Sequence, residues 1–515
     1  MRVGIIDLGT NSVRFDVQQI GPGKKLERLH REKLMVRLGQ DVFLNGRLDP
    51  EAFKRTLEAF ESFRQTSTDL GVNKIIAFGT SALREASDSQ DLLDQIKKDT
   101  GIEVRVISGE EEALLIARGI LSNEKPPKGI FTLVDIGGGS TEISICRGKE
   151  LIHSHSFGLG TARLQQVFLK TIPPKPAAKG QPNPIDLLHR YIKSVLLPTF
   201  FSEDWPKSDR IIGSSGTILA LHKVLRNGNG KNGKNSKSSN KDAFDRKELR
   251  KLIKTMSTMT TSQLLSLPGL EARRVDMILA GAILLDEVME ALRTKKVFIT
   301  DYSLRDGILE EETQLFRQNK TSPLAFHLND LYTKARRLGA NEQHFQHVRI
   351  TAEQLFTRLA KLHKLKPDWK AYLSAAAILH DTGEAISPTD HAFHSYYIVK
   401  NAKFPSMEEW ECELIAQLCL WHTGGKLSKN PHPLFRGDKP KTQAFLKLLA
   451  ILRISDALDR SHKALIKIKE IRMDKSEIRI KVSNKTATDL EVLRVEQKKD
   501  LFEKVFRRRL VIQRV

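Results

Sequence analysis

The chain has 515 residues, which at roughly 150 residues per domain predicts three to four domains. Hydrophobic residues make up 40% of it, enough for ordinary globular cores, so a chain disordered throughout is excluded. Lys and Arg number 84 against 62 Asp and Glu, a formal net charge of +22. This excess favours polyanionic partners such as nucleic acid, an anionic membrane surface or phosphorylated ligands; solubility alone is the simpler alternative.

The cysteine content and the lengths of the apolar runs indicate the cellular compartment of the protein. The 3 cysteines include no CxxC pair and cannot build a disulfide framework, which fits a reducing cytoplasm. The sequence has no run of 18 apolar residues, and its opening, MRVGIIDLGT, lacks the pattern of a signal peptide. We therefore expect a cytoplasmic protein without a membrane span.

Strand-like and helix-like stretches alternate in the first third of the chain. The run VGIID predicts a buried strand, and helices are expected over 51–70 and 89–98. Further strands are expected over 74–80 and 104–108. Alternation of this kind predicts an α/β fold.

An internal repeat is the most informative feature of this region. Residues 7–12 (DLGTNS) and 135–140 (DIGGGS) each follow an apolar strand and continue into a second strand, VRFDV and TEISI. Two β-hairpins with the same acidic, glycine-bearing turn predict a duplicated domain. A coincidence of two glycine-rich turns is the alternative, because Asp and Gly are common turn residues.

The two turns carry donors and acids suited to a phosphate bound through a cation. Backbone N–H groups of a glycine-rich turn can converge on an anion, and hydroxyl groups add donors. The candidate phosphate-binding residues are Thr10, Asn11, Ser12, Gly137, Gly138, Gly139 and Ser140. The carboxylates of Asp7 and Asp135 would repel a bare phosphate, so Mg²⁺ (or Mn²⁺) is expected between carboxylate and phosphate.

A third glycine-rich element, GSSGT over 213–217, lies between a strand and a helix. A helix N-terminus that follows a glycine turn can bind an anion, and the candidate donors are Ser214, Ser215 and Gly216. An ordinary strand-to-helix connection explains the same pattern equally well.

The segment ISGEEEALLIARGI predicts a helix that carries a candidate general base. Ser108 and Glu111 have the spacing of a capping box, and apolar residues at helical spacing predict a core-facing stripe. Glu112 lies on the flank of that stripe, where a carboxylate can border a cleft and take a proton from water. A solvated acid in the first helical turn is the alternative.

Arg84 is a second candidate, in the segment TSALREA. It follows a strand and lies near a helix start, so its guanidinium could bind phosphate through two nitrogens. A surface ion pair with Glu85 or Asp88 is the alternative.

Six motifs together resemble the exopolyphosphatase/guanosine pentaphosphate phosphatase family. DLGTNS, TSALREA, ISGEEEA, VDIGGGSTE, FGLGTARL and GSSGT occur in that family's order and spacing over roughly residues 1 to 315. The resemblance implies two ribonuclease-H-like domains of the actin-like ATPase superfamily, facing each other across a cleft. It implies that Glu112 activates water, that Asp135 and Glu142 position cation and water, and that Arg84 and the two turns contact phosphate.

The activity that this resemblance implies is removal of the terminal phosphate of inorganic polyphosphate, one unit after another. The sister activity on guanosine pentaphosphate (pppGpp) is the alternative. A kinase of the same superfamily and a non-catalytic relative are weaker alternatives, since the acidic residues are complete and no sugar- or acetate-binding motif is recognisable. The resemblance also implies a homodimer.

The last third of the chain has a different pattern of expected helices and strands. Helices are expected over 324–363 and 369–379, and strand patterns return only near 478–482 and in the final RLVIQRV, with a helix over 496–506 between them. We expect an all-α domain followed by a small α+β unit. The four predicted domains cover 1–124, 125–315, 322–465 and 466–515.

The helical region also resembles an HD phosphohydrolase site. His347, the pair His380–Asp381, and Asp456 follow the order of that site, and His394 and His422 lie between them and could join a second metal. Imidazole and carboxylate groups suit a borderline divalent metal. The resemblance leaves open a metal-loaded site, a second activity as a nucleotide phosphohydrolase, and a structural relic.

The excess positive charge is concentrated in two places. The low-complexity stretch 226–241 has five basic residues and no acid, and residues 463–515 have 16 basic against 8 acidic residues. A polyphosphate chain can leave a cleft and run along such a surface, whereas a nucleotide is too short. The charge therefore favours polyphosphate, and neither a specific nucleic acid nor a membrane is expected as a partner.

Overall fold

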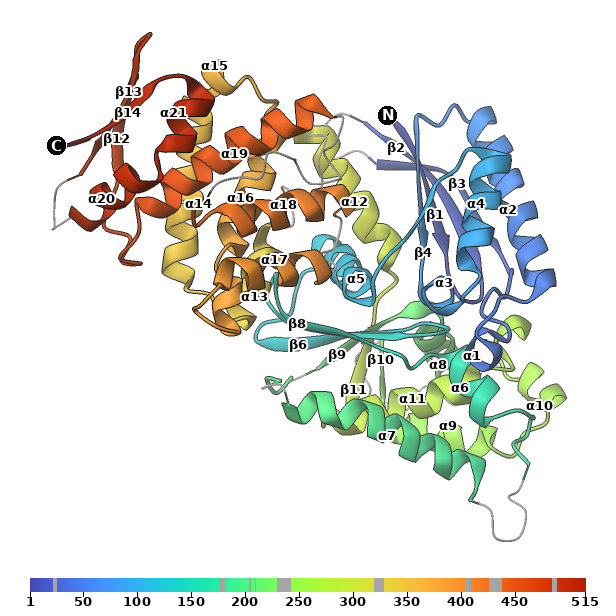
Figure 1. Cartoon of the computed structure of the whole chain (residues 1–515). Coiled ribbons are helices and arrows are strands. Elements are labelled where there is room, and N and C mark those ends of the chain that lie inside the picture. Colours follow the sequence, from blue (N-terminus) through green and yellow to red (C-terminus); the bar gives the residue numbers. More distant parts are fainter. Residues whose placement is uncertain are drawn as a thin grey trace. The chain divides into compact units, whose positions relative to one another are not determined.

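A computed structural model describes the chain except for residues 22–25, 176–181, 203–204, 209, 229–241, 319–327, 403–406, 408, 426–437 and 484–488. The chain divides into two compact units, Met1–Arg317 and Gln318–Val515 (Figure 1). Most of the basic stretch predicted over 226–241 lies outside the described residues. The four domain boundaries expected from the sequence stay predictions. No helix in the described part of the chain is long and apolar enough to cross a membrane.

The first sheet of unit 1 has five strands in the order β3-β2-β1-β4-β5. Strands β1 to β3 form an antiparallel meander, while β4 and β5 join it in parallel. Its strands are β1 (Arg2–Leu8), β2 (Val13–Ile20), β3 (Leu26–Leu34), β4 (Lys74–Gly79) and β5 (Val104–Val106). The helices of this half are α1 (Val42–Asn45), α2 (Pro50–Asp69), α3 (Ser81–Glu85), α4 (Ser89–Thr100) and α5 (Gly109–Asn123).

The second sheet of unit 1 has six strands in the order β10-β11-β9-β6-β7-β8. Its strands are β6 (Ile130–Ile136), β7 (Thr141–Arg147), β8 (Glu150–Phe157), β9 (Ile211–Ser214), β10 (Ala243–Asp245) and β11 (Lys296–Ile299). Read from β8 to β11, the strand order and directions repeat those of the first sheet from β3 to β5. The duplicated α/β domain predicted from the two acidic turns is confirmed.

The other helices of unit 1 pack around the second sheet and join the two halves (Figure 1). They are α6 (Thr161–Phe168), α7 (Pro184–Ser202), α8 (Ser215–Gly228), α9 (Arg246–Met256), α10 (Thr261–Leu265), η1 (Ala272–Arg274), α11 (Ile278–Ala291) and α12 (Leu304–Gln318).

Helices α5 and α12 cross at a glycine contact. A side-chain carbon added to Gly119 of α5 would lie 2.7 Å from the backbone nitrogen of Gly307 in α12. One added to Gly307 would meet the carbonyl oxygen of Leu115. Since only glycine permits so close an approach, this crossing fixes the position of α5 within unit 1.

Unit 2 is mainly helical and ends in a small mixed sheet. Its helices are α13 (Leu328–Arg337), α14 (Glu342–Arg358), α15 (Ala360–His363), α16 (Trp369–Leu379), η3 (Thr382–Ala385), α17 (His391–Asn401), α18 (Glu409–Trp421), α19 (Lys439–Ala457), α20 (Asp489–Lys498) and α21 (Asp500–Phe506). Its strands are β12 (Ile468–Met473), β13 (Glu477–Val482) and β14 (Arg509–Arg514), paired in that order.

The predicted helix over 324–363 is not continuous in the described residues. Gly339 adopts a left-handed conformation with φ +72 and ends the turn after α13. The side chain of Asn341 then caps α14 by accepting a hydrogen bond from the nitrogen of His344.

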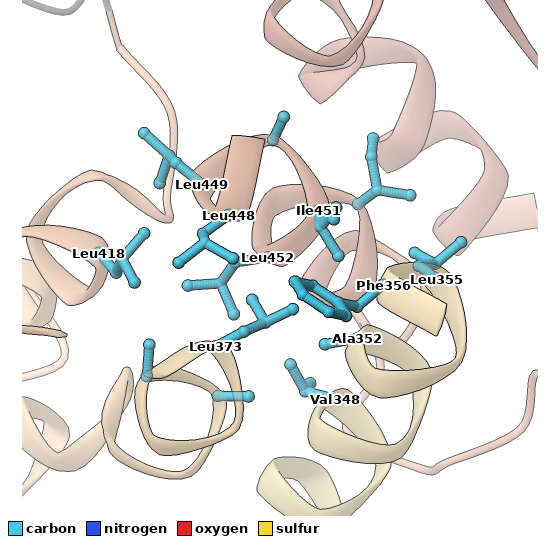
Figure 2. Close-up of a cluster of buried hydrophobic side chains, with 14 of the residues drawn as sticks. Val348, Ala352, Leu355, Phe356, Leu373, Leu418, Leu448, Leu449, Ile451 and Leu452 are labelled. Carbon is cyan, nitrogen blue, oxygen red and sulfur yellow. The ribbon is translucent and has the colours of Figure 1, made fainter. Parts of the chain in front are cut away.

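The core of unit 2 is formed by apolar side chains from four helices, as Figure 2 shows. Helix α14 contributes Val348, Ala352, Leu355 and Phe356; α16 contributes Leu373; α18 contributes Leu418; and α19 contributes Leu448, Leu449, Ile451 and Leu452. These side chains are buried, and at helical spacing they hold the four helices together. Helices α14 and α19 carry His344 and Asp456 of the titratable cluster described below, and His380 and His422 directly follow α16 and α18.

Candidate active site

The two predicted hairpin turns have the same local structure. In the first, the nitrogen of Gly9 donates a hydrogen bond to the carbonyl oxygen of Ser12 at 3.2 Å. In the second, the nitrogen of Gly137 donates to the carbonyl oxygen of Ser140 at 2.9 Å. The sequence repeat therefore has a geometric counterpart in the closure of each turn.

The tips of the two turns meet at one cleft of unit 1. A side-chain carbon at Gly138 would lie 2.7 Å from Nδ2 of Asn11 and 2.8 Å from Cβ of Thr10. The cleft holds about 1050 Å³, including space open to solvent. Predicted site residues that line it are Asp7, Thr10, Asn11, Ser12, Glu112, Asp135, Gly137, Gly138, Gly139, Ser140, Ser215 and Gly216. The other three predicted residues of this site, Arg84, Glu142 and Ser214, contact lining residues.

Four carboxylates gather at the cleft, and together they form the carboxylate cluster: Asp7, Glu112, Asp135 and Glu142. Burial raises the pKa of Glu112 to about 7, and the neighbouring Asp7 and Asp135 add to the rise while Arg84 opposes it. Burial likewise raises the pKa of Asp135, and that of Glu142 lies well above its usual range. Buried oxygen ligands that repel one another fit a hard divalent cation such as Mg²⁺ or Mn²⁺.

Two hydroxyl groups orient members of the carboxylate cluster. The hydroxyl of Ser214, at the end of β9, donates a hydrogen bond to Oδ2 of Asp135. The hydroxyl of Ser156 donates to Oε1 of Glu142 at 2.8 Å. The carboxylates are therefore held by fixed donors.

Arg84 connects the candidate base with the second turn. Its Nη1 donates a hydrogen bond to Oε2 of Glu112 at 2.8 Å, and its Nη2 lies 3.4 Å from the hydroxyl of Ser140. The alternative surface pair with Glu85 is not formed, because Glu85 binds Arg163 instead. Arg84, with a side chain 20% exposed, thus lies next to the groups expected to contact phosphate.

Two consecutive glutamates at the start of α5 have different surroundings. The hydroxyl of Ser108 accepts a hydrogen bond from the nitrogen of Glu111 at 3.1 Å, as the capping spacing predicted. The Glu111 carboxylate binds Arg105 through hydrogen bonds of 2.7 and 2.9 Å. Glu112, with a side chain 12% exposed, lines the cleft.

Four basic residues line the same cleft and were missed by the sequence reasoning. They form the cation cluster: Arg14, Lys33, Arg273 and Arg274. A side-chain carbon on Gly216 would lie 2.8 Å from Cζ of Arg274, so this glycine leaves room for the guanidinium beside the third predicted turn. The preceding residue, Ser215, has φ 84, a conformation uncommon for residues other than glycine and often found at functional sites.

Unit 2 contains a second titratable cluster. Nε2 of His344 lies 3.2 Å from Nε2 of His380, 3.3 Å from Oδ2 of Asp381 and 3.7 Å from Oδ1 of Asp456. On the other oxygen of Asp381, Nε2 of His422 lies at 3.3 Å and Nε2 of His391 at 3.5 Å. These six residues form the histidine–aspartate cluster, with Asp381 between its two halves.

The remaining ring nitrogens of this cluster are held by acceptors. Nδ1 of His344 lies 2.9 Å from Oδ2 of Asp459, and Nδ1 of His380 and His422 lie 2.9 and 2.6 Å from backbone carbonyl oxygens. Such contacts direct the Nε2 lone pairs inward, as in metal-binding histidines. Lys498 donates a hydrogen bond to Oδ2 of Asp456 and so balances part of the negative charge.

Two of the expected histidines lie one helical turn away from the histidines that the structure places in the cluster. His347 does not face the cluster; its Nε2 lies 2.5 Å from the carbonyl oxygen of Ile466, and His344 takes the expected place. His391 likewise takes the place expected for His394. Residues three apart share a helix face, so the order of motifs alone could not distinguish them. His380, Asp381, His422 and Asp456 are brought together as expected.

Comparison with known proteins identifies the family. The Ppx/GppA phosphatase family model matches residues 17–316, and the model of Ppx/GppA phosphatase domain III matches residues 333–500. The chain belongs to the Ppx/GppA phosphatase family. Both halves of unit 1 and most of unit 2 are therefore Ppx/GppA sequence, in agreement with the six motifs read from the chain.

Three relatives illustrate the range of this Ppx/GppA family. Exopolyphosphatase 1 of Mycobacterium bovis is 27% identical over 310 residues, which cover 60% of this chain and 87% of that protein. A guanosine-5'-triphosphate,3'-diphosphate pyrophosphatase of Photobacterium profundum is 24% identical over 449 residues, 87% of this chain and 86% of that one. The crystal structure of an exopolyphosphatase from Cytophaga hutchinsonii matches 61% of this chain and 98% of its own, with a TM-score of 0.54 and 29% identity.

Proposed function

We propose that this protein is an exopolyphosphatase, which hydrolyses the terminal phosphoanhydride bond of inorganic polyphosphate and releases orthophosphate. The observation that carries the proposal is the Arg84–Glu112 pair. The Glu112 carboxylate of this pair has a pKa raised to about 7 and lines a cleft between two glycine-bearing turns. A base with a pKa near neutrality is suited to deprotonating water. Relatives named exopolyphosphatase and the family match support the assignment.

In the mechanism, the terminal phosphoryl group lies between the two turns. Backbone N–H groups of Gly138–Ser140 and the guanidinium of Arg84 stabilise the charge that spreads over its oxygens in the transition state. Mg²⁺ or Mn²⁺, held by Asp7, Asp135 and Glu142, would supply further neutralisation of phosphate charge.

Glu112 orients the attacking water and takes its proton. The water oxygen forms the new bond to phosphorus, in line with the bridging oxygen, and the bond from phosphorus to that bridging oxygen breaks. Orthophosphate leaves, and the shortened chain carries away the bridging oxygen as its new terminus. The chain can then advance and be cleaved again.

The sister activity, removal of the 5'-terminal phosphate of pppGpp, is the second candidate for the same cleft. The relative from Photobacterium profundum, which aligns with both units, bears the name of that activity. Steady-state rates of the purified protein on long-chain polyphosphate and on pppGpp separate the two. We expect a higher kcat/KM for polyphosphate; a higher value for pppGpp would reverse the assignment.

For unit 2 we propose a divalent metal site at the histidine–aspartate cluster. Its support is the convergence of buried imidazole nitrogens and carboxylate oxygens, with His344, His380, Asp381 and Asp456 as one donor set. Such a site could hydrolyse nucleotide phosphates. The test measures phosphate release from nucleotides by the Glu112→Gln variant, with and without the added change Asp381→Ala. If neither variant releases phosphate, unit 2 has no nucleotide phosphohydrolase activity and the cluster is proposed only to bind a metal.

A homodimer and a cytoplasmic location are also proposed. Light scattering of the purified chain would measure the first, and fractionation of cells the second.

A further inference from the structure

One face of helix α20, in the C-terminal part of unit 2, carries two buried charged residues. Glu491, Val495 and Lys498 follow one another at helical spacing, so they share this face, and all three are buried. Oε1 of Glu491 accepts a hydrogen bond at 3.2 Å from the backbone nitrogen of Ser461, which follows α19 in the chain. The same face of α20 therefore directs Lys498 towards the interior of unit 2.

The ammonium group of Lys498 contacts two residues of the histidine–aspartate cluster. Its Nζ donates a hydrogen bond to Oδ2 of Asp456 at 2.5 Å and one to the carbonyl oxygen of His422 at 3.3 Å. The side chain of Lys498 is 4% exposed, against 14% for that of Asp456. Since a buried charge without a partner is costly, Lys498 and Asp456 stabilise each other in the unit.

The two oxygens of Asp456 have different partners. Oδ1 lies 3.7 Å from Nε2 of His344 and 3.8 Å from Nε2 of His380, within the donor set proposed for a metal. Oδ2 is bound by Lys498. A metal on this donor set would therefore share one carboxylate with an ammonium group, and two cations so close in a buried site repel each other.

We propose that Lys498 is an internal cation of the histidine–aspartate cluster and competes with a divalent metal for the charge of Asp456. Without metal it neutralises the buried carboxylate, and with metal it weakens binding. Because Lys498 belongs to α20, the C-terminal part of unit 2 sets how tightly the cluster holds its metal. This inference rests on the metal site proposed for unit 2 and goes beyond it, since Lys498 is not itself a ligand.

Calorimetric titration of Mn²⁺ into the full chain, freed of metal by a chelator, tests this role with Lys498→Met. Methionine keeps an unbranched side chain and removes the charge, so we expect the Kd for Mn²⁺ to fall about 10-fold. The matched control is Lys499→Met, because the ion pairs of Lys499 are with Glu496 and Glu503, outside the cluster. An unchanged or higher Kd of Lys498→Met, or an equal fall in the control, would overturn the inference.

Thermal unfolding gives a second readout that covers an unstable variant. Removal of one partner of a buried ion pair leaves the other charge unpaired, so Lys498→Met should lower the Tm of the metal-free protein. Saturating Mn²⁺ supplies the missing positive charge and should raise this Tm by more than it raises that of the wild-type protein. A variant that folds only with Mn²⁺ supports the inference, and a rise no larger than in the wild-type protein contradicts it.

The same titrations distinguish this inference from the proposed metal site. If the wild-type protein binds Mn²⁺ and Lys498→Met binds it equally well, the metal site stands and the role of Lys498 is overturned. If neither protein binds Mn²⁺ or Zn²⁺, both are overturned.

Discussion

The Arg84 guanidinium donates a hydrogen bond to the Glu112 carboxylate at 2.8 Å, although the two residues lie on different helices, α3 and α5. The pair joins a positive charge suited to phosphate with the base proposed to activate water. Burial raises the pKa of Glu112, and the charge and hydrogen bond of Arg84 lower it. The pKa of the proposed base is therefore lowered by the same side chain that would bind the substrate.

Glu112→Gln should abolish phosphate release while leaving chain binding close to normal. The amide keeps the size of the carboxylate but cannot accept a proton, and loss of a general base costs about 10² to 10⁴ in rate. The measurement is kcat on polyphosphate, together with binding by calorimetry. Glu110→Gln, an exposed neighbour on the same helix, is the control and should retain full activity. Full activity of Glu112→Gln would remove the assignment of the base.

Arg84→Gln should move the acid limb of the pH–rate profile to higher pH. Glu112 must be deprotonated to act, so activity falls as the pH drops through its pKa of about 7. Arg84 favours the charged carboxylate, and its removal raises the pKa and shifts the limb upward. Profiles of kcat/KM at saturating Mg²⁺ would measure this shift, and Arg84→Lys should restore part of it. A limb displaced to lower pH contradicts the proposed coupling.

Gly307→Ala should destabilise unit 1 and lower its activity. The added methyl group meets the carbonyl oxygen of Leu115, and overpacking of this kind costs about 1–3 kcal/mol. Because the crossing holds α5, displacement of α5 would also move Glu112. Thermal unfolding and kcat are the measurements. Gly158→Ala is the matched control, since its added carbon approaches no atom closer than 4.0 Å; equal effects of both changes would refute the role of the crossing.

Local patterns explain why the first cleft could be predicted from the sequence. In a hairpin the strand, turn and returning strand are contiguous, so the repeat placed Asp7 and Asp135 at equivalent strand positions. The cation cluster was missed because Arg274 reaches Gly216 from a segment 58 residues further along the chain. Arg14 and Lys33 did carry a signal, since their strand register places them in line with Asp7.

The histidines of unit 2 show where local patterns fail. His344 and His347 lie on the same face of α14, and motif order accommodates either. The choice between them depends on the packing of α14 against α16 and α19, which brings His344 to His380. These are tertiary effects that no spacing in the sequence records.

Metal binding by the histidine–aspartate cluster should strengthen as the pH rises towards 9. Burial alone would lower the pKa of His344, but Asp381 and Asp459 raise it to about 9, so the imidazole is protonated below that pH. A metal needs the neutral ring and must displace this proton, so affinity rises with pH and binding releases protons. Calorimetric titration of Mn²⁺ or Zn²⁺ into the full chain, in buffers of different ionisation enthalpy, measures both effects. His344→Ala should lose the metal and His347→Ala should retain it; the opposite result would restore the register expected from the sequence.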